Sequence, residues 1–203
     1  MAKKSKTHIL FILDKSGSME IAKSQTISGF NEYVETLKKR YSDGSVKFTL
    51  SVFDTAVQTL QNDVALEEIL PLSDATYVPS GLTALYDAVQ SEVNKIKAGK
   101  KDRVLVIIMT DGEENSSKEA TRAGVFQLIS EKESEGNWTF VFLGANQDSW
   151  ESGSKINIAA GNTSNYDQHN TYAAFASLTT ATLNYAESNS RQSRSFWRED
   201  SDK

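Results

Sequence analysis

Cysteine is absent from the 203 residues of this sequence. Without it the chain has neither disulfide bonds nor thiolate chemistry and needs no oxidising compartment, so we predict a cytoplasmic location. Long apolar runs are also missing, because none approaches the roughly 20 residues that span a bilayer. Basic residues are outnumbered, 22 against 27 acidic ones, and the net charge of -5 argues against a nucleic-acid-binding surface. We therefore expect neither a membrane nor a nucleic-acid partner.

A basic lead, residues 1–6, opens the sequence in the manner of a signal peptide. The apolar run after it covers only residues 9–13 and ends in Asp14, which is too short for the core of an export signal. With 38% hydrophobic and 24% charged residues, a chain of this length is expected to form one domain. We place that domain at residues 7–187.

The last segment, residues 188–203, is polar and is predicted to be a mobile tail. Phe196 and Trp197 are its only large apolar residues. They form either a short motif that docks on a partner or an anchor that folds back onto the domain, and the sequence leaves both interpretations open.

The order of apolar patterns predicts the fold. Near-continuous apolar runs at residues 9–13, 104–109 and 139–143 are typical of parallel strands that helices cover on both faces. Residues 46–52 alternate between apolar and polar, which predicts a strand with one buried face, continued by an edge hairpin at 55–60. Helical stripes, with apolar residues three and four apart, run through residues 27–37, 85–96, 124–128 and 172–186.

Residues 146–170 are rich in Asn, Ser and Gly, and they predict loops around a short helix and one more edge strand. Asp148 in this stretch suits a helix cap.

Because strands and helices alternate along the chain, we expect an α/β fold. Its doubly wound, mainly parallel central sheet has one antiparallel edge strand and helices on both faces.

Polar residues follow two of the buried strands directly, where ligands bind in open α/β sheets. Asp14, Ser16 and Ser18 form an Asp-x-Ser-x-Ser loop after the first strand, and Asp111 follows the run at 104–109. Carboxylate and hydroxyl oxygens are the ligands that hard cations prefer, and the loops offer no nitrogen or sulfur ligand. The sequence therefore predicts a divalent cation here: Mg²⁺, with Mn²⁺ or Ca²⁺ as alternatives.

Three segments together resemble the metal-ion-dependent adhesion site (MIDAS) of von Willebrand factor type A (vWA) domains. They are the loop at 14–18, the segment 80–88 with Thr83, and Thr110-Asp111-Gly112, in the order that this family has. Any one of them occurs often by chance, but three in order are specific. The resemblance covers residues 7–143 and extends to about 186, and the chain resembles stand-alone bacterial or phage vWA proteins.

The resemblance implies a vWA, Rossmann-like fold and a protein-binding module instead of an enzyme. It implies that Ser16 and Ser18 bind the metal directly, that Asp14 and Asp111 act mostly through water, and that Thr83 does either. In such sites an acidic side chain of a protein partner completes the metal shell. Glu113 and Glu114 could instead fold over the ion and oppose an acidic partner, which leaves the chemistry of the partner open.

Plainer interpretations stand beside the metal site. The first loop could simply cap a helix, and Asp-Gly at 111–112 could be a strand-ending turn. Lys15 is expected to be solvated at the rim, and Asp54 is assigned to the turn before Thr55 instead of to the metal. His8 and His169 lack spaced partners and are expected to be structural or exposed.

Two further functions remain open. A Mg²⁺-dependent phosphoryl-transfer enzyme would use Asp14 as its nucleophile and Asp111 as a metal ligand. Such an enzyme places a second Asp two residues later, where this sequence has Ser16. In the third hypothesis, a structural or assembly protein acts through its C-terminal tail.

Overall fold

The computed structural model describes residues 5–145, 149–188 and 190–197, so Asp148 lies outside the described residues. The strands are β1 (Thr7–Asp14), β2 (Val46–Phe53), β3 (Val57–Ala65), β4 (Arg103–Thr110), β5 (Trp138–Ala145) and β6 (Thr163–Tyr166). The helices are α1 (Lys23–Arg40), α2 (Leu85–Lys95), α3 (Arg122–Ser134), α4 (Ser149–Lys155) and α5 (Thr171–Glu187). Short 3-10 turns are η1 (Gly17–Glu20), η2 (Leu66–Glu68), η3 (Ala160–Asn162) and η4 (Gln168–Asn170).

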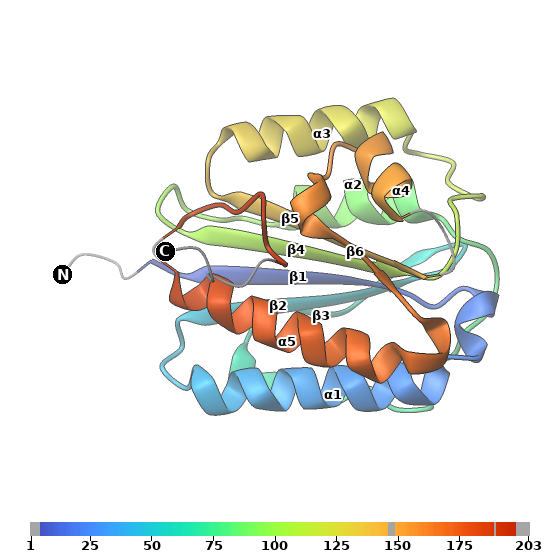
Figure 1. The fold of residues 1–203 in the computed structure, drawn as a ribbon, viewed down its shortest axis with the longest axis horizontal. Helices are drawn as coiled ribbons and strands as arrows, with labels where there is room; N and C mark the ends of the chain where they lie inside the picture. Colours follow the sequence, from blue (N-terminus) through green and yellow to red (C-terminus); the bar gives the residue numbers. More distant parts are fainter. Residues whose placement is uncertain (1–4, 146–148, 189, 198–203) are drawn as a thin grey trace.

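The strands form one sheet in the order β3-β2-β1-β4-β5-β6 (Figure 1). Only β3 is antiparallel, at one edge of the sheet. The prediction of a doubly wound, mainly parallel sheet with one antiparallel edge strand is confirmed. The strand order changes direction between β1 and β4, which is where ligands bind in such sheets.

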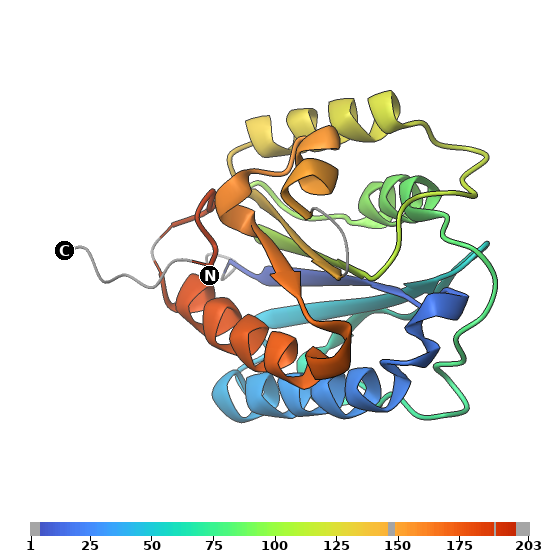
Figure 2. The same cartoon turned by 45° about the vertical axis from the view of Figure 1, so that its right-hand side comes forward.

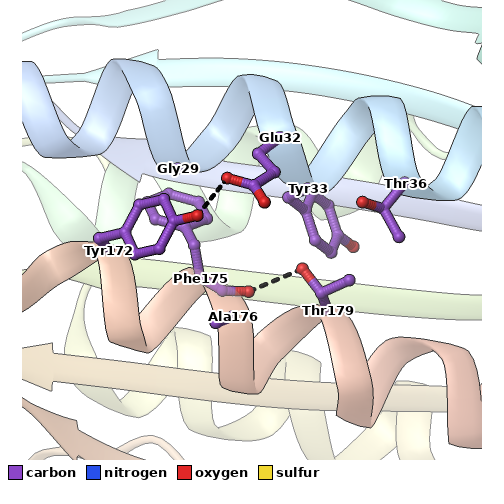
Figure 3. Close-up of a pocket in the computed structure, with 8 residues that line it drawn as sticks. All are labelled: Gly29, Glu32, Tyr33, Thr36, Tyr172, Phe175, Ala176 and Thr179. Atoms are coloured by element: carbon purple, nitrogen blue, oxygen red, sulfur yellow. Dashed lines mark hydrogen bonds between the residues drawn. The ribbon is translucent and has the colours of Figure 1, made fainter.

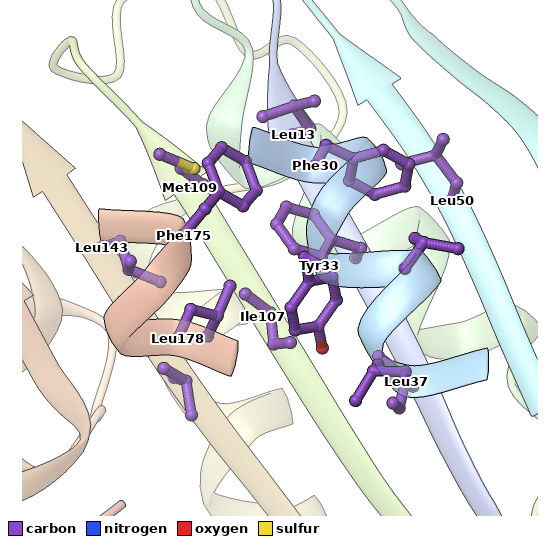
Figure 4. Packing of buried hydrophobic residues seen from close by; sticks show 14 of the residues in the cluster. Leu13, Phe30, Tyr33, Leu37, Leu50, Ile107, Met109, Leu143, Phe175 and Leu178 are labelled. Carbon is purple, nitrogen blue, oxygen red and sulfur yellow. The ribbon is translucent and has the colours of Figure 1, made fainter. Parts of the chain in front are cut away.

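Helices cover both faces of the sheet, with α1 and α5 on one face and α2, α3 and α4 on the other (Figures 1 and 2). All eight residues of β1 are buried. Phe11 packs in the cluster under α1 and α5, as does Leu13 (Figure 4), whereas Leu10 and Ile12 pack in the cluster under α2 and α3. Burial on both faces explains why β1 has a continuous apolar sequence.

The strand β2 is more buried than its alternating pattern predicts. Ser51, expected on the exposed face, is fully buried, because α2 lies over it and its hydroxyl donates a 2.5 Å hydrogen bond to Glu92. Thr59 on β3 also donates to this carboxylate. Tertiary packing therefore buries polar side chains that an isolated strand would expose. The following edge strand, β3, is also longer than the predicted hairpin at 55–60.

Helices α1 and α5 pack closely because Gly29 has no side chain. A Cβ atom placed there would lie 2.5 Å from Cδ2 of Phe175, whose ring fills the contact (Figure 3). Beside it, the hydroxyl of Tyr172 donates to Glu32 and links the two helices at the surface. Among the described residues, every helix is too short or too polar to cross a membrane.

The stretch 146–170 contains α4 and the short parallel strand β6, in line with the predicted helix and edge strand. The strand β5 pairs with β4 along its length, but β6 pairs only with Phe142–Ala145, so among the described residues no strand lies on the β6 side of the first half of β5. Residues 190–197 lie against this region instead. Ser193 and Phe196 both bond through their backbone to Asn162.

Of the two interpretations of Phe196, the structure shows the one in which it folds back. Phe196 is 4% exposed, and the centroid of its ring lies 6.0 Å from that of Tyr185 and 5.1 Å from that of Trp197. The boundary between domain and mobile tail at residue 188 stays a prediction.

Candidate metal site

The first site loop and Asp111 meet because β1 and β4 are neighbours. The two strands pair in parallel, with Leu13 opposite Met109, so the loops that follow them start side by side. Asp14 is the last residue of β1, and Asp111 directly follows β4. The strand order at the centre of the sheet therefore places two carboxylates together.

Hydrogen bonds fix the loop around Asp14. One carboxylate oxygen accepts from the backbone N–H of Ser16 at 2.6 Å, and the other accepts from the hydroxyl of Thr110 at 2.5 Å. The backbone N–H of Gly17 donates to the carbonyl of Gly81 at 3.2 Å. This last bond ties the first loop to the segment that carries Thr83.

The hydroxyl groups lie next to the carboxylates. Ser18 Oγ donates to Asp111 at 2.6 Å and lies 3.2 Å from Ser16 Oγ. Gly112 borders both Thr83 and Ser18, since a Cβ atom there would lie 3.4 Å from the Thr83 hydroxyl and 3.8 Å from that of Ser18. The structure thus brings all five sequence-predicted residues, Asp14, Ser16, Ser18, Thr83 and Asp111, to one place.

Two carboxylates in this cluster are buried. Asp14 is fully buried and Asp111 is 7% exposed. Within the described part of the chain, no Lys, Arg or His forms an ion pair with either of them. Lys15, expected to be solvated, pairs instead with Asp54, which also accepts from the backbone N–H of Ala56 in the turn where the sequence placed it.

The electrostatic cost of this arrangement is visible in both carboxyl groups. Burial raises the pKa of Asp14 to about 6, and the neighbouring charge of Asp111 adds to the rise. Burial also raises the pKa of Asp111. Desolvated carboxylates with no counter-charge are unfavourable, and a bound cation would relieve this cost.

The residues fit a hard divalent cation. They offer carboxylate and hydroxyl oxygens only, as Mg²⁺ prefers, and Ser18 is exposed, so the cluster opens to solvent. Among the described residues, no three His, Cys, Asp or Glu side chains gather as they do in carboxylate-rich or zinc sites. A cation here would therefore depend on the hydroxyl groups as well as on Asp14 and Asp111.

Sequence reasoning missed two residues that support the site. The side-chain amide of Gln168 donates to Asp111 and to the backbone carbonyl of Ser18, each at 2.9 Å. The buried hydroxyl of Tyr77 donates to the carbonyl of Asp14 at 2.6 Å. Neither residue belongs to a motif, and only the folded chain brings them near residues more than 50 positions away.

Glu114 does not cover the site. One of its carboxylate oxygens accepts from the backbone of Ser116 and Ser117, and the other accepts from the hydroxyl of Ser117 and from the N–H of Tyr86 in the first turn of α2. Glu113 is exposed and lines a small hollow with Lys155. The acidic pair thus has structural and surface contacts of its own.

The two histidines lie away from this cluster. His8 is buried between two carboxylates, 3.3 Å from Asp63 and 3.6 Å from Asp102, and His169 is exposed. These positions agree with the structural and exposed roles expected from the sequence.

Several solved structures share this architecture. The vWF domain of the type V pili tip protein Mfa5 from Porphyromonas gingivalis matches with a TM-score of 0.66 and 12% identity, covering 93% of this chain and 98% of that one. Proximal thread matrix protein 1 from the mussel byssus, with a zinc-occupied MIDAS motif, matches with a TM-score of 0.64 and 14% identity, covering 90% of this chain and 48% of that one. Manganese-loaded TRAP protein from Plasmodium vivax matches with a TM-score of 0.59 and 18% identity, covering 86% of this chain and 73% of that one.

These likenesses show that the chain has the vWA fold, as the three segments of sequence indicate. At 12% to 18% identity they show the fold alone. This chain spans about half the length of the mussel protein, 48%. No protein-family model matches the sequence, and no curated protein matches it.

Proposed function

We propose that this protein is a binding module that holds a divalent cation, Mg²⁺, and engages a protein partner through it. Asp14, Ser16, Ser18, Thr83 and Asp111 are the residues that would hold the ion. The observation that carries the proposal is the pair of buried carboxylates, with no basic partner in the described part of the chain, beside three hydroxyl-bearing side chains. The metal-loaded relatives with the same fold support it.

The metal half of the proposal is tested by isothermal titration of the metal-free protein with Mg²⁺ and Mn²⁺. We expect saturable one-to-one binding that Asp14→Ala and Asp111→Ala abolish, because each removes one of the two charges that attract the cation. Asp74→Ala is the matched control, since Asp74 is exposed and, among the described residues, forms its ion pair with Lys23 away from the cluster. Equal binding by all four proteins would overturn the metal site.

The surface beside the cluster suits a protein partner. Ile21, three residues after Ser18, is 65% exposed, and Leu82, next to Thr83, is 53% exposed. Large exposed apolar side chains beside a polar centre are typical of protein-binding surfaces. A bound cation that keeps an open position supplies attraction for a carboxylate, so we propose that an Asp or Glu of the partner completes the shell.

The partner half is tested by affinity capture from a cell extract with the immobilised protein. Because the contact runs through the cation, we expect a protein that binds in Mg²⁺, is released by a chelator and is not captured by Asp111→Ala. The Asp74→Ala variant should capture it normally. A partner that binds equally with and without the chelator would contradict cation-dependent docking.

The environment of Asp14 argues against the phosphoryl-transfer alternative. A nucleophilic carboxylate needs an oxygen that reaches the substrate, but Asp14 is fully buried and both of its oxygens accept short hydrogen bonds. Ser16, two residues later, cannot serve as the general acid.

The tail hypothesis loses its main support for a different reason, because Phe196 is buried within the domain.

A further inference from the structure

A polar hollow of about 550 Å³ lies at the end of the sheet opposite to the candidate metal site. The chain enters β1 and β2 here, and the loop between α2 and β4 forms one wall (Figures 1 and 2). Five lysines from these three segments line it. They are Lys6, Lys47, Lys97, Lys100 and Lys101.

Within residues 5–145, 149–188 and 190–197, none of these five lysines forms an ion pair with a carboxylate. Lys47 donates to the backbone carbonyl of Asp63. Like charges gathered in one hollow repel one another, so the arrangement is unfavourable unless an anion joins it.

The two aspartates that line the hollow serve other contacts. Asp102 uses both oxygens to hold the loop, accepting from the backbone N–H of Lys6 and of Gly99, each at 2.8 Å. Asp63 and Asp102 flank His8, whose buried Nε2 has no hydrogen-bond partner among the described residues. The hollow therefore combines excess positive charge with an unsatisfied polar atom in its wall.

The lining limits the class of ligand. Among the described residues it contains Ala98 and Gly99 but no phenyl, phenol or indole ring, so it offers neither a stacking surface for a nucleobase nor an apolar surface for a hydrophobic ligand. Several flexible ammonium groups around one space suit a compact anion with several charges. We propose that this hollow binds a compact oligophosphate, either a free molecule or the phosphorylated headgroup of a lipid.

Titration calorimetry with sodium triphosphate tests the proposal, in metal-free buffer because triphosphate also binds Mg²⁺. We expect saturable one-to-one binding that weakens as salt is added. The variant Lys97→Ser/Lys100→Ser/Lys101→Ser should bind at least about tenfold more weakly, because each removed ammonium group contributes a part of the attraction. These lysines are exposed, and thermal melts should show the variant folded.

A matched control separates a site from general attraction between charges. Lys118→Ser/Arg122→Ser/Lys155→Ser removes the same charge outside the hollow and should bind triphosphate within about twofold of the unchanged protein. Equal weakening in both variants, or the absence of saturable binding, would overturn the proposal. Because neither variant alters Asp14 or Asp111, this result is independent of the metal site.

Vesicles distinguish the two sources of the anion. Vesicles that contain a phosphoinositide bisphosphate are compared with vesicles of equal charge made with phosphatidylserine. Sedimentation with the first alone, lost in the Lys97→Ser/Lys100→Ser/Lys101→Ser variant, assigns a lipid headgroup. Triphosphate binding without sedimentation assigns a free oligophosphate.

Discussion

Replacing Asp14 by asparagine is expected to stabilise the metal-free protein at pH 7.5 and to abolish its response to Mg²⁺. The fold holds this carboxyl group at a pKa of about 6, against an ordinary value of 3.8, so its ionisation costs about 3 kcal/mol of stability. The amide keeps an acceptor for the backbone of Ser16 and a donor toward the Thr110 hydroxyl. After imperfect hydrogen bonds are subtracted, we expect a gain of about 1–2 kcal/mol.

The sign of this effect predicts its pH dependence. The folded pKa of Asp14 lies above the unfolded one, so the folded state binds the proton more tightly, and ionisation destabilises the fold as the pH rises through about 6. Well below the ordinary pKa of 3.8 the group is protonated in both states and the cost disappears. The advantage of Asp14→Asn should therefore be largest above pH 6 and should vanish below about pH 3.

Urea unfolding of both proteins, with a chelator and with excess Mg²⁺, measures these effects. Mg²⁺ should raise the unfolding free energy of the unchanged protein, because only the folded state assembles the site. It should leave the Asp14→Asn variant unchanged. If the variant is less stable than the unchanged protein in chelator at pH 7.5, the burial cost assigned to Asp14 is wrong.

Replacing Phe196 by alanine is expected to destabilise the domain by about 3 kcal/mol, as removal of a buried phenylalanine usually does. The ring packs against Tyr185 of α5 and beside Trp197, and it is 4% exposed. The midpoint of urea unfolding should fall with no change in the slope. The loss would show that the segment after α5 belongs to the folded unit.

Phe126→Ala is the matched control, because it removes the same side chain from a 44% exposed position on α3. Its cost should stay below about 1 kcal/mol. Equal and small effects in the two variants would mean that Phe196 is not anchored in solution, which is the behaviour expected of a mobile tail.

Much of the fold follows from local patterns. The continuous apolar runs of β1, β4 and β5 require helices on both faces, and the stripes of α1 and α5 supply one of these layers. The same reasoning failed for Ser51, which looks exposed in an alternating strand but lies under α2 beside Glu92. Alternation reports the faces of one strand and does not report what packs over them.

The candidate site also has one part that the sequence predicts and another that only the fold reveals. The spacing of Asp14, Ser16 and Ser18 is local, so the sequence alone indicates three oxygen ligands on one loop. Asp111 could be joined to them because ligands bind at the ends of parallel strands, a general rule of this architecture. No such rule predicts the role of Gln168, because its contact with Asp111 depends on how η4 packs against the strand ends.

The sequence by itself determined the type of sheet and predicted the candidate oxygen ligands and their order, because these depend on residue types and short periods. Only the tertiary structure decided which charges are paired. It joined Lys15 to Asp54, buried Asp14 and Asp111 with no basic partner among the described residues, and gathered lysines from three segments of an acidic chain. The physical reason is that Coulomb energies depend on distance and burial, which the order of residues does not state.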